Sequence, residues 1–184
     1  MIPNLITLVR LALVPVMAWT LAGHHHGIAA TIFLLIAVSD WLDGFIARRF
    51  RLTSRVGAAL DPVADKLSML VATLILAMQH LIPLWLAIAI IARDVIIVAG
   101  AGLYRAVVGS IEFTPTRLSK VNTALEFALL LAVMASAAGW IPSAGWELPA
   151  FVIVLASVVA SGVQYVWIWG LKAIRNRKRP VARA

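Results

Sequence analysis

The sequence contains no cysteine, and only eight of its 184 residues are acidic. The absence of cysteine excludes disulfides, thiolate metal sites and thiol catalysis. Charged residues make up 13% of the chain, whereas an ordinary soluble domain carries about 25%. Hydrophobic residues make up 62%, and the mean hydropathy is +0.97. This composition excludes a soluble enzyme, a disordered tail and a disulfide-stapled secreted domain, and it predicts a protein whose solvent is lipid.

Six apolar stretches follow one another along the chain. Each is close to the roughly 20 residues that a helix needs to cross a hydrocarbon core. They are Leu5–Ala22, Gly27–Ala47, Ala58–Met78, Ile82–Tyr104, Lys120–Ala138 and Leu148–Leu171. The first carries Arg10 inside the run and has no basic head before it, so we expect a mature helix rather than a cleaved signal. We predict an all-α, polytopic integral membrane protein with six transmembrane helices, in which residues 1–184 form a single membrane domain.

The net charge of +8 is compatible with a nucleic acid or with an anionic membrane surface. The connections after the first, third and fifth stretches contain no Lys or Arg. Basic residues instead follow the other three stretches: Arg48, Arg49, Arg51, Arg55, Arg105, Arg117, Lys172, Arg175, Arg177, Lys178, Arg179 and Arg183. Because basic connections face the cytoplasm, we predict that both termini are cytoplasmic, with residues 172–184 as a basic tail. We place the chain in a bacterial inner membrane and expect no nucleic-acid partner.

Half of the acidic residues lie at the junction of the second and third stretches. Asp40 and Asp43 are three residues apart, and Asp61 and Asp65 are four apart, so on helices each pair shares one face. Pro62 predicts that the second of these helices starts or kinks at Asp61. One pair lies on a helix that arrives at the cytoplasmic end and the other on a helix that leaves it, so the pairs can face each other.

Four carboxylates in one place need compensation, because each costs about 2.5–3.5 kcal/mol near hydrocarbon on insertion scales. The nearby cations are Arg48, Arg49 and Lys66. Oxygen-only ligation selects hard ions, so we predict two Mg²⁺ or Mn²⁺ ions of the kind that neutralise a pyrophosphate during displacement. Gly44 and Gly57 leave room for a ligand to approach helix backbone. The alternative is a set of buried ion pairs that only lock the helices together.

The motif Asp40-x2-Asp43-Gly44-x2-Ala47-Arg48-x8-Gly57-x3-Asp61-x3-Asp65 resembles the complete signature of the CDP-alcohol phosphotransferase (phosphatidyltransferase) family. The opening Pro3-Asn4-Leu5-Ile6-Thr7-Leu8-x-Arg10 is similar to the start of that family. The resemblance implies a six-helix membrane enzyme, commonly a homodimer, that opens the pyrophosphate of a CDP-linked lipid such as CDP-diacylglycerol at the cytoplasmic interface. CMP leaves, and the phosphatidyl group passes to an alcohol.

The resemblance also implies roles for the residues of the motif. Asp40, Asp43 and Asp61 would hold the metals. Asp65 would be both a metal ligand and the base that takes the proton of the acceptor hydroxyl, a role that suits a carboxylate but is assigned to Asp65 by the family alone. The residues implied to line the CDP site are Gly44, Ala47, Arg48 and Gly57.

The acceptor alcohol is predicted from the second half of the chain. Arg93 and Lys120 resemble the family branch that makes phosphatidylglycerophosphate, but Ala101 and Asn122 stand where that branch places further cations. Arg93-Asp94-Val95 and Ser119-Lys120-Val121-Asn122-Thr123 look like the eukaryotic-type cardiolipin synthases, whose acceptor is phosphatidylglycerol. We therefore predict phosphatidylglycerol as acceptor, cardiolipin as product, and Arg93, Lys120 and Asn122 as acceptor-binding residues. The alternative is a phosphatidylglycerophosphate synthase that uses glycerol 3-phosphate.

Other interpretations stay open. The acceptor candidates can instead form a structural polar cluster at helix ends, although we do not expect Arg93 and Asp94 to pair, because adjacent residues on a helix point about 100° apart. A cation transporter is a remote alternative, since intramembrane carboxylates also mark ion paths, but all four aspartates lie at one end. The intact motif disfavours a catalytically silent scaffold. Three consecutive histidines, His24 to His26, cannot all converge on one ion without a fixed loop, so we predict no metal there.

Overall fold

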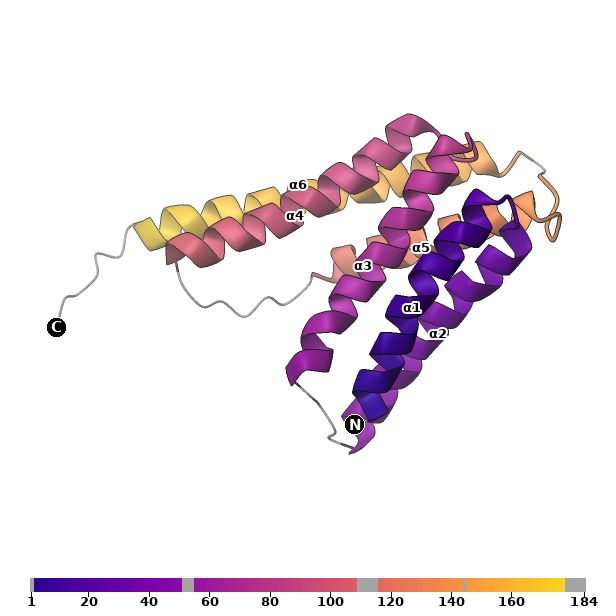
Figure 1. Ribbon diagram of the computed structural model, residues 1–184. Helices are drawn as coiled ribbons and strands as arrows, with labels where there is room; N and C mark the ends of the chain where they lie inside the picture. Colours follow the sequence, from indigo (N-terminus) through magenta and orange to yellow (C-terminus); the bar gives the residue numbers. More distant parts are fainter. Residues whose placement is uncertain (1, 51–54, 109–115, 144, 178–184) are drawn as a thin grey trace. The chain divides into compact units, whose positions relative to one another are not determined.

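The computed structural model describes the backbone of residues 2–50, 55–108, 116–143 and 145–177, and the side chains of residues 9–39, 66–100, 116–143 and 145–168. Every described element is an α-helix (Figure 1). The helices are α1 (Ile2–Ala22), α2 (His26–Phe50), α3 (Arg55–Met78), α4 (Leu84–Val108), α5 (Arg117–Ala137) and α6 (Glu147–Arg177). The prediction of an all-α chain is confirmed, and each helix covers one predicted apolar stretch.

The start of α3 differs from the prediction. Of the two outcomes predicted at Asp61, a helix start or a kink, the start is wrong: the helix begins at Arg55, and Pro62 lies inside helical backbone. A kink there stays a prediction. A proline lacks its own N–H and its ring crowds the carbonyl four residues earlier, but the turn before it closes hydrogen bonds that do not need that donor. The helix therefore begins closer to the α2–α3 connection than the position of the proline alone predicts.

The chain divides into two compact units. Unit 1 contains Met1–Leu84 and Phe127–Glu147, and unit 2 contains Trp85–Glu126 and Leu148–Ala184. Helices α1, α2 and α3 therefore belong to unit 1, α4 and nearly all of α6 belong to unit 2, and α5 contributes one half to each. A single membrane domain over residues 1–184 stays a prediction.

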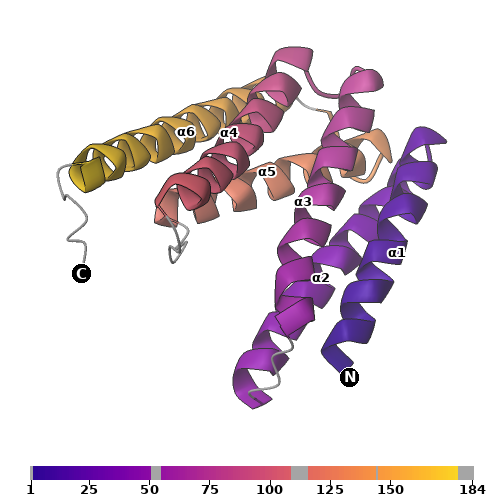
Figure 2. The same cartoon turned by 60° about the vertical axis from the view of Figure 1, so that its left-hand side comes forward.

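In unit 1, α1 packs against both α2 and α3, and the three helices lie side by side (Figure 2). Met17 and Leu21 of α1, Phe33 of α2 and Leu76 of α3 form part of its buried apolar core. Phe33 also stacks on Phe127 of α5, with ring centroids 4.6 Å apart and the planes inclined by 17°. Such a pair contributes about 0.5–1.5 kcal/mol beyond the burial of its area, so it holds the second half of α5 in unit 1.

Three helices of unit 1 end in the same hydrogen-bonded turn. Each is followed by a residue with positive φ: His24 (60°) after α1, His80 (58°) after α3 and Gly139 (76°) after α5. In each turn the next residue donates its N–H to a carbonyl five residues back, at 2.9 Å; the donors and acceptors are His25 and Thr20, Leu81 and Leu76, and Trp140 and Ala135. This is the Schellman motif, in which glycine is the usual residue. A side chain at this position costs about 1–2 kcal/mol, so the two histidines are held in strained backbone.

Among the described residues, two helical segments are long and apolar enough to cross a membrane, judged by length and composition: Arg117–Ala137 and Glu147–Ile168. The segment of α6 has a hydropathy of 2.0, and only 22% of it is buried inside the protein. Val152, Ile153, Val159 and Val163 are 52–60% exposed. Three further apolar helical segments in the described ranges are shorter: Val9–Ala22, His26–Ser39 and Lys66–Met78. An apolar helix with this little protein cover is suited to contact with lipid.

Candidate active site

The four aspartates of the motif lie in α2 and α3, on either side of the connection between these helices. Asp40 and Asp43 are in the second half of α2, and Asp61 and Asp65 are in the first half of α3. Their side chains lie outside the described residues, so their positions come from the helix backbone. Because α2 and α3 pack against each other in unit 1, both pairs are at the same end of that unit.

The two pairs lie at similar distances along the chain from the connection. At a rise of about 1.5 Å per residue, Asp43 and Asp61 are each about 10 Å from the end of their own helix at the connection, and Asp40 and Asp65 are each about 15 Å from it. The helix ends themselves are not level, because α2 extends beyond the start of α3 (Figure 1 and Figure 2). Both pairs therefore lie within about three helical turns of the connection, as two facing pairs of carboxylates require.

The predicted CDP-binding residues lie closer to the same connection. Gly44, Ala47 and Arg48 follow Asp43 in α2, and Gly57 lies in the first turn of α3. They too fall outside the residues whose side chains are described. Their backbone positions put them between the aspartates and the end of unit 1, and their roles in nucleotide binding stay predictions.

Arg10 of α1 is a cation of unit 1 in addition to Arg48, Arg49 and Lys66, which the sequence places near the aspartates. Its side chain is 1% exposed in the interior of unit 1. Counted along each helix from its own end at the α1–α2 connection, Arg10 lies about 18 Å away and Asp40 about 20 Å away. Since α1 packs against α2, this buried arginine is near the level of Asp40. The signal in the sequence was a charged residue inside the first apolar stretch.

The donor set of the motif fits hard divalent cations. Four carboxylates from two packed helices offer only oxygen ligands, which Mg²⁺ and Mn²⁺ prefer. Elsewhere, the described side chains form no group of three or more His, Cys, Asp or Glu that could hold a metal. The aspartate quartet is therefore the candidate metal centre.

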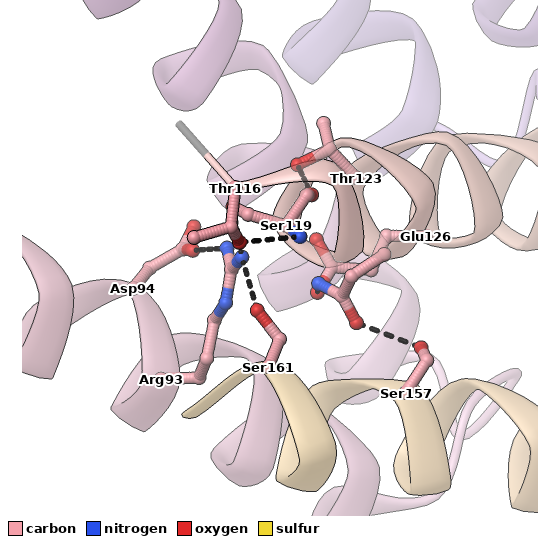
Figure 3. Close-up of polar contacts among 9 residues, drawn as sticks. Arg93, Asp94, Thr116, Ser119, Thr123, Glu126, Ser157 and Ser161 are labelled. Atoms are coloured by element: carbon pink, nitrogen blue, oxygen red, sulfur yellow. Dashed lines mark hydrogen bonds and ion pairs between the residues drawn. The ribbon is translucent and has the colours of Figure 1, made fainter. Parts of the chain in front are cut away.

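Arg93 is at the centre of a buried polar cluster that joins α4, α5 and α6 in unit 2 (Figure 3). Its side chain is 4% exposed, and Nη1 donates to Asp94 Oδ1 at 2.7 Å. Nη2 donates to Ser119 Oγ at 2.7 Å and to Ser161 Oγ at 2.9 Å. The expectation that Arg93 and Asp94 do not pair is wrong. The angle of about 100° separates the Cα–Cβ directions, but the arginine side chain is long enough to bring its guanidinium back to the neighbouring carboxylate.

Further polar contacts continue the Arg93 cluster along α5 and α6. Thr116 Oγ1 donates to Gln164 Oε1 at 3.0 Å, and Ser157 Oγ donates to Asn122 Oδ1 at 2.7 Å. Asn122 Nδ2 donates to Glu126 Oε1 at 2.7 Å. The positions on each helix are three or four residues apart, so each set shares one face. We call this set the polar ladder; its members are Thr116, Ser119, Asn122, Glu126, Ser157, Ser161 and Gln164, with Arg93 inserted from α4.

The structure separates the three predicted acceptor-binding residues. Arg93 and Asn122 are buried and hydrogen bonded to other side chains of unit 2, whereas Lys120 is exposed. Lys120 and Asn122 are two residues apart on α5 and therefore point to different sides of the helix. Lys120 thus lies outside the polar ladder, while Arg93 and Asn122 have the contacts expected of a structural polar cluster. The acceptor-binding role of all three residues stays a prediction.

Several members of the polar ladder were not singled out from the sequence. Glu126 interrupts the apolar stretch Lys120–Ala138, and Ser157, Ser161 and Gln164 recur at helical spacing inside the stretch Leu148–Leu171. Polar residues at this spacing within a membrane-length segment mark a face that packs against another helix. This spacing of polar residues was the feature of the sequence from which these members of the polar ladder could have been predicted.

Replacing Ser161 with Ala is expected to lower the stability of the folded chain. The substitution removes one of the two hydroxyl acceptors of Arg93 Nη2, and a buried donor left without a partner costs about 1–3 kcal/mol. Thermal unfolding of the purified protein in detergent should therefore begin at a lower temperature. Ser143→Ala is the matched control, because Ser143 is exposed in the α5–α6 connection. Equal unfolding temperatures for the two variants would contradict the assigned contact.

Comparison with known proteins tests the motif independently of its geometry. Residues 1–169 match the family model described as CDP-alcohol phosphatidyltransferase. The chain belongs to the CDP-alcohol phosphatidyltransferase family. The match includes the aspartate motif of α2 and α3 and most of the residues of unit 2, so the resemblance inferred from the motif is confirmed.

Individual relatives in this family carry two kinds of name. A cardiolipin synthase (CMP-forming)/mitochondrial hydrolase fusion protein of Schizosaccharomyces pombe is 35% identical over 89% of this chain and 30% of its own length. The cardiolipin synthase (CMP-forming) of Homo sapiens is 34% identical over 73% of this chain and 50% of its own. A CDP-diacylglycerol–glycerol-3-phosphate 3-phosphatidyltransferase of Blochmanniella floridana is 34% identical over 76% of each chain. The chain spans half or less of the length of the first two relatives.

Proposed function

We propose that this chain is a membrane phosphatidyltransferase that moves the phosphatidyl group from CDP-diacylglycerol to an alcohol and releases CMP. The observation that carries the proposal is the complete aspartate motif, with one pair on each of the packed helices α2 and α3, on either side of their connection. Membership of the CDP-alcohol phosphatidyltransferase family supports it.

In this proposal the motif residues divide the chemistry between them. Asp40, Asp43, Asp61 and Asp65 together would hold two Mg²⁺ or Mn²⁺ ions, which when bound neutralise charge on the pyrophosphate. Asp65 accepts the proton of the attacking hydroxyl. The residues that line the CDP site are Gly44, Ala47, Arg48 and Gly57, with the guanidinium of Arg48 on phosphate.

We further propose that all six helices cross a bacterial inner membrane, with both termini, the basic tail and the active site in the cytoplasm. The basic connections after the second and fourth apolar stretches support this orientation. The exposed apolar faces of the membrane-length segments in α5 and α6 support the membrane itself. A homodimer is part of the same proposal.

For the acceptor we propose phosphatidylglycerol, with cardiolipin as product. The relatives from Schizosaccharomyces pombe and Homo sapiens carry the name cardiolipin synthase. In addition, the charge of Arg93 is met by Asp94 at 2.7 Å, which leaves it poorly suited to compensate the dianion of glycerol 3-phosphate. Arg93, Lys120 and Asn122 are the proposed acceptor-binding residues, and the exposed Lys120 is the one that an incoming lipid phosphate reaches first.

Phosphatidylglycerophosphate synthesis is the second candidate function. One observation favours it: the relative from Blochmanniella floridana, which this chain matches over 76% of both lengths, is named for transfer to glycerol 3-phosphate. The cations missing at Ala101 and Asn122 would then have to come from elsewhere, and Arg105 and Arg117 are the candidates.

A side-by-side assay separates the two acceptors. Purified protein with CDP-diacylglycerol and Mg²⁺ or Mn²⁺ should release CMP and form cardiolipin from phosphatidylglycerol. Each absent charge-assisted contact is worth about 1.5–3 kcal/mol, so glycerol 3-phosphate should be used about 10²–10⁴-fold less efficiently. A preference for glycerol 3-phosphate would establish the second candidate instead. No release of CMP with either acceptor would contradict the transferase proposal as a whole.

A further inference from the structure

All four histidines of the chain lie at one end of unit 1. His24, His25 and His26 are in and after the α1–α2 connection, and His80 is in the α3–α4 connection. In the sequence of these connections, the α5–α6 connection and the adjoining helical turns (residues 19–29, 76–84 and 135–147), Glu147 is the only other titratable residue. The charge of this end is therefore set by histidine.

A side-chain contact with Gln79 determines which ring nitrogen of His26 carries a hydrogen. Gln79 Nε2 donates to the carbonyl oxygen of Leu21 at 2.7 Å, because a carbonyl can only accept. Gln79 Oε1 therefore faces His26 Nε2, at 3.0 Å, and that nitrogen must carry a hydrogen. The contact ties α1, α2 and the α3–α4 connection together.

Three of the histidines also line a recess. A pocket of about 360 Å³ is bounded by His24, His25 and His26 on one side and by Trp140 and its neighbours on the other. Trp140 is 59% exposed, and its ring lies against Gly27, where an added Cβ would approach Cζ2 to 3.1 Å. The volume is within the range of about 300–1,000 Å³ of small-ligand sites, and an exposed indole is typical of a membrane–water interface.

Two of the histidines occupy strained positions in the turns that end α1 and α3. The equivalent turn after α5 has Gly139, for which the left-handed backbone is unstrained. Residues in sparsely populated backbone regions cluster at functional sites. His24 and His80 place an imidazole where glycine would satisfy the turn.

We propose that this histidine end, made of His24, His25, His26, His80 and Trp140, binds the headgroups of anionic phospholipids when its imidazoles are protonated. Histidine changes charge between about pH 5 and 8, so this end carries up to four positive charges in acid against the single carboxylate of Glu147. Basic side chains at a membrane surface attract anionic lipid. The inference rests on the proposed membrane placement and not on the proposed catalytic roles.

The test uses the full chain in nanodiscs of phosphatidylcholine, with short-chain phosphatidylserine as the added probe, because that lipid is not the proposed acceptor. The apparent affinity should rise about tenfold or more between about pH 8 and about pH 5.5. The double variant His24→Asn/His80→Asn should lose about half of that rise, since it removes two of the four imidazoles and Asn tolerates the left-handed backbone without a charge. Gly139→His should enlarge the rise; the added Cβ meets no atom within 4 Å, and its backbone is strained in the same way as that of His24 and His80.

Lys172→Gln is the control at the basic tail. It should leave the pH-dependent rise unchanged, because lysine stays charged across this range and lies outside the histidine end. An unchanged pH dependence in the double asparagine variant would overturn the proposal, and so would equal binding of the water-soluble headgroup alone. Release of CMP is measured separately: a chain that binds lipid in this pH-dependent way but releases no CMP would contradict the proposed function and leave this inference standing.

Discussion

Replacement of Asp40, Asp43 or Asp61 with Asn is expected to abolish release of CMP from CDP-diacylglycerol while the chain stays folded in detergent. Loss of one carboxylate removes a ligand from a shared metal site, and the pyrophosphate then loses the charge that stabilises its displacement. Folding should survive, because one negative charge fewer reduces repulsion within the quartet. CMP release by the purified variants, measured with Mg²⁺ and with Mn²⁺, tests this expectation.

Glu147→Gln is the matched control for these variants. It also removes one carboxylate, but from the first turn of α6, away from the α2–α3 connection. This variant should keep the turnover of the unmodified chain. Thermal unfolding of all four variants shows whether any lost activity reflects lost structure. Near-normal turnover in any of the three aspartate variants would contradict its assignment as a metal ligand.

Asp65→Asn is expected to give a different result. If Asp65 takes the proton of the acceptor hydroxyl, the variant should still bind the CDP-lipid at saturating metal concentration, while transfer falls by about 10²–10⁴-fold. Binding is measured with labelled CDP-diacylglycerol in the absence of acceptor, and transfer is measured in a single turnover. The two measurements separate the role of Asp65 as the base from its role as a metal ligand.

The opposite pattern would reassign this residue. If binding of the CDP-lipid is lost together with transfer, Asp65 is chiefly a metal ligand, as the helix face that it shares with Asp61 also allows. Asp40→Asn is the reference for that outcome, because Asp40 is assigned to the metals alone.

The six helices could be predicted because the signals for them are local. Each apolar stretch overlaps one helix, and Ala22 and Met78 were predicted correctly as the last residues of α1 and α3. The helices α2, α4 and α6 run three to six residues past the predicted ends, because their last turns carry basic or polar residues that an apolar stretch does not include. The start of α5 was placed at Lys120 and is at Arg117, because Thr116 caps the helix: its Oγ1 accepts the N–H of Ser119 at 3.1 Å. A capping hydroxyl extends a helix beyond its apolar stretch, and hydropathy alone does not register it.

The candidate site was predictable to the extent that its residues lie close together in the sequence. The spacing of Asp40, Asp43, Asp61 and Asp65 indicates which of them share a helix face, and it also gives the family resemblance. The polar ladder was not predictable in the same way, because Arg93 and Ser161 are 68 residues apart and Asn122 and Ser157 are 35 apart. Helical periodicity shows which residues share a face, but not which two faces meet. The partners of Arg93 therefore required the structure.

The polar ladder has a consequence for how the chain enters a bilayer during synthesis. The ribosome completes α5 before α6, so Asn122 is inserted before Ser157 exists. The membrane-length segment of α5 has the lower hydropathy, 1.5 against 2.0 for that of α6. In the proposed membrane placement, Asn122 would enter lipid without the hydroxyl of Ser157, its partner on α6. Satisfaction of this buried amide of α5 is thus coupled to completion of the last helix.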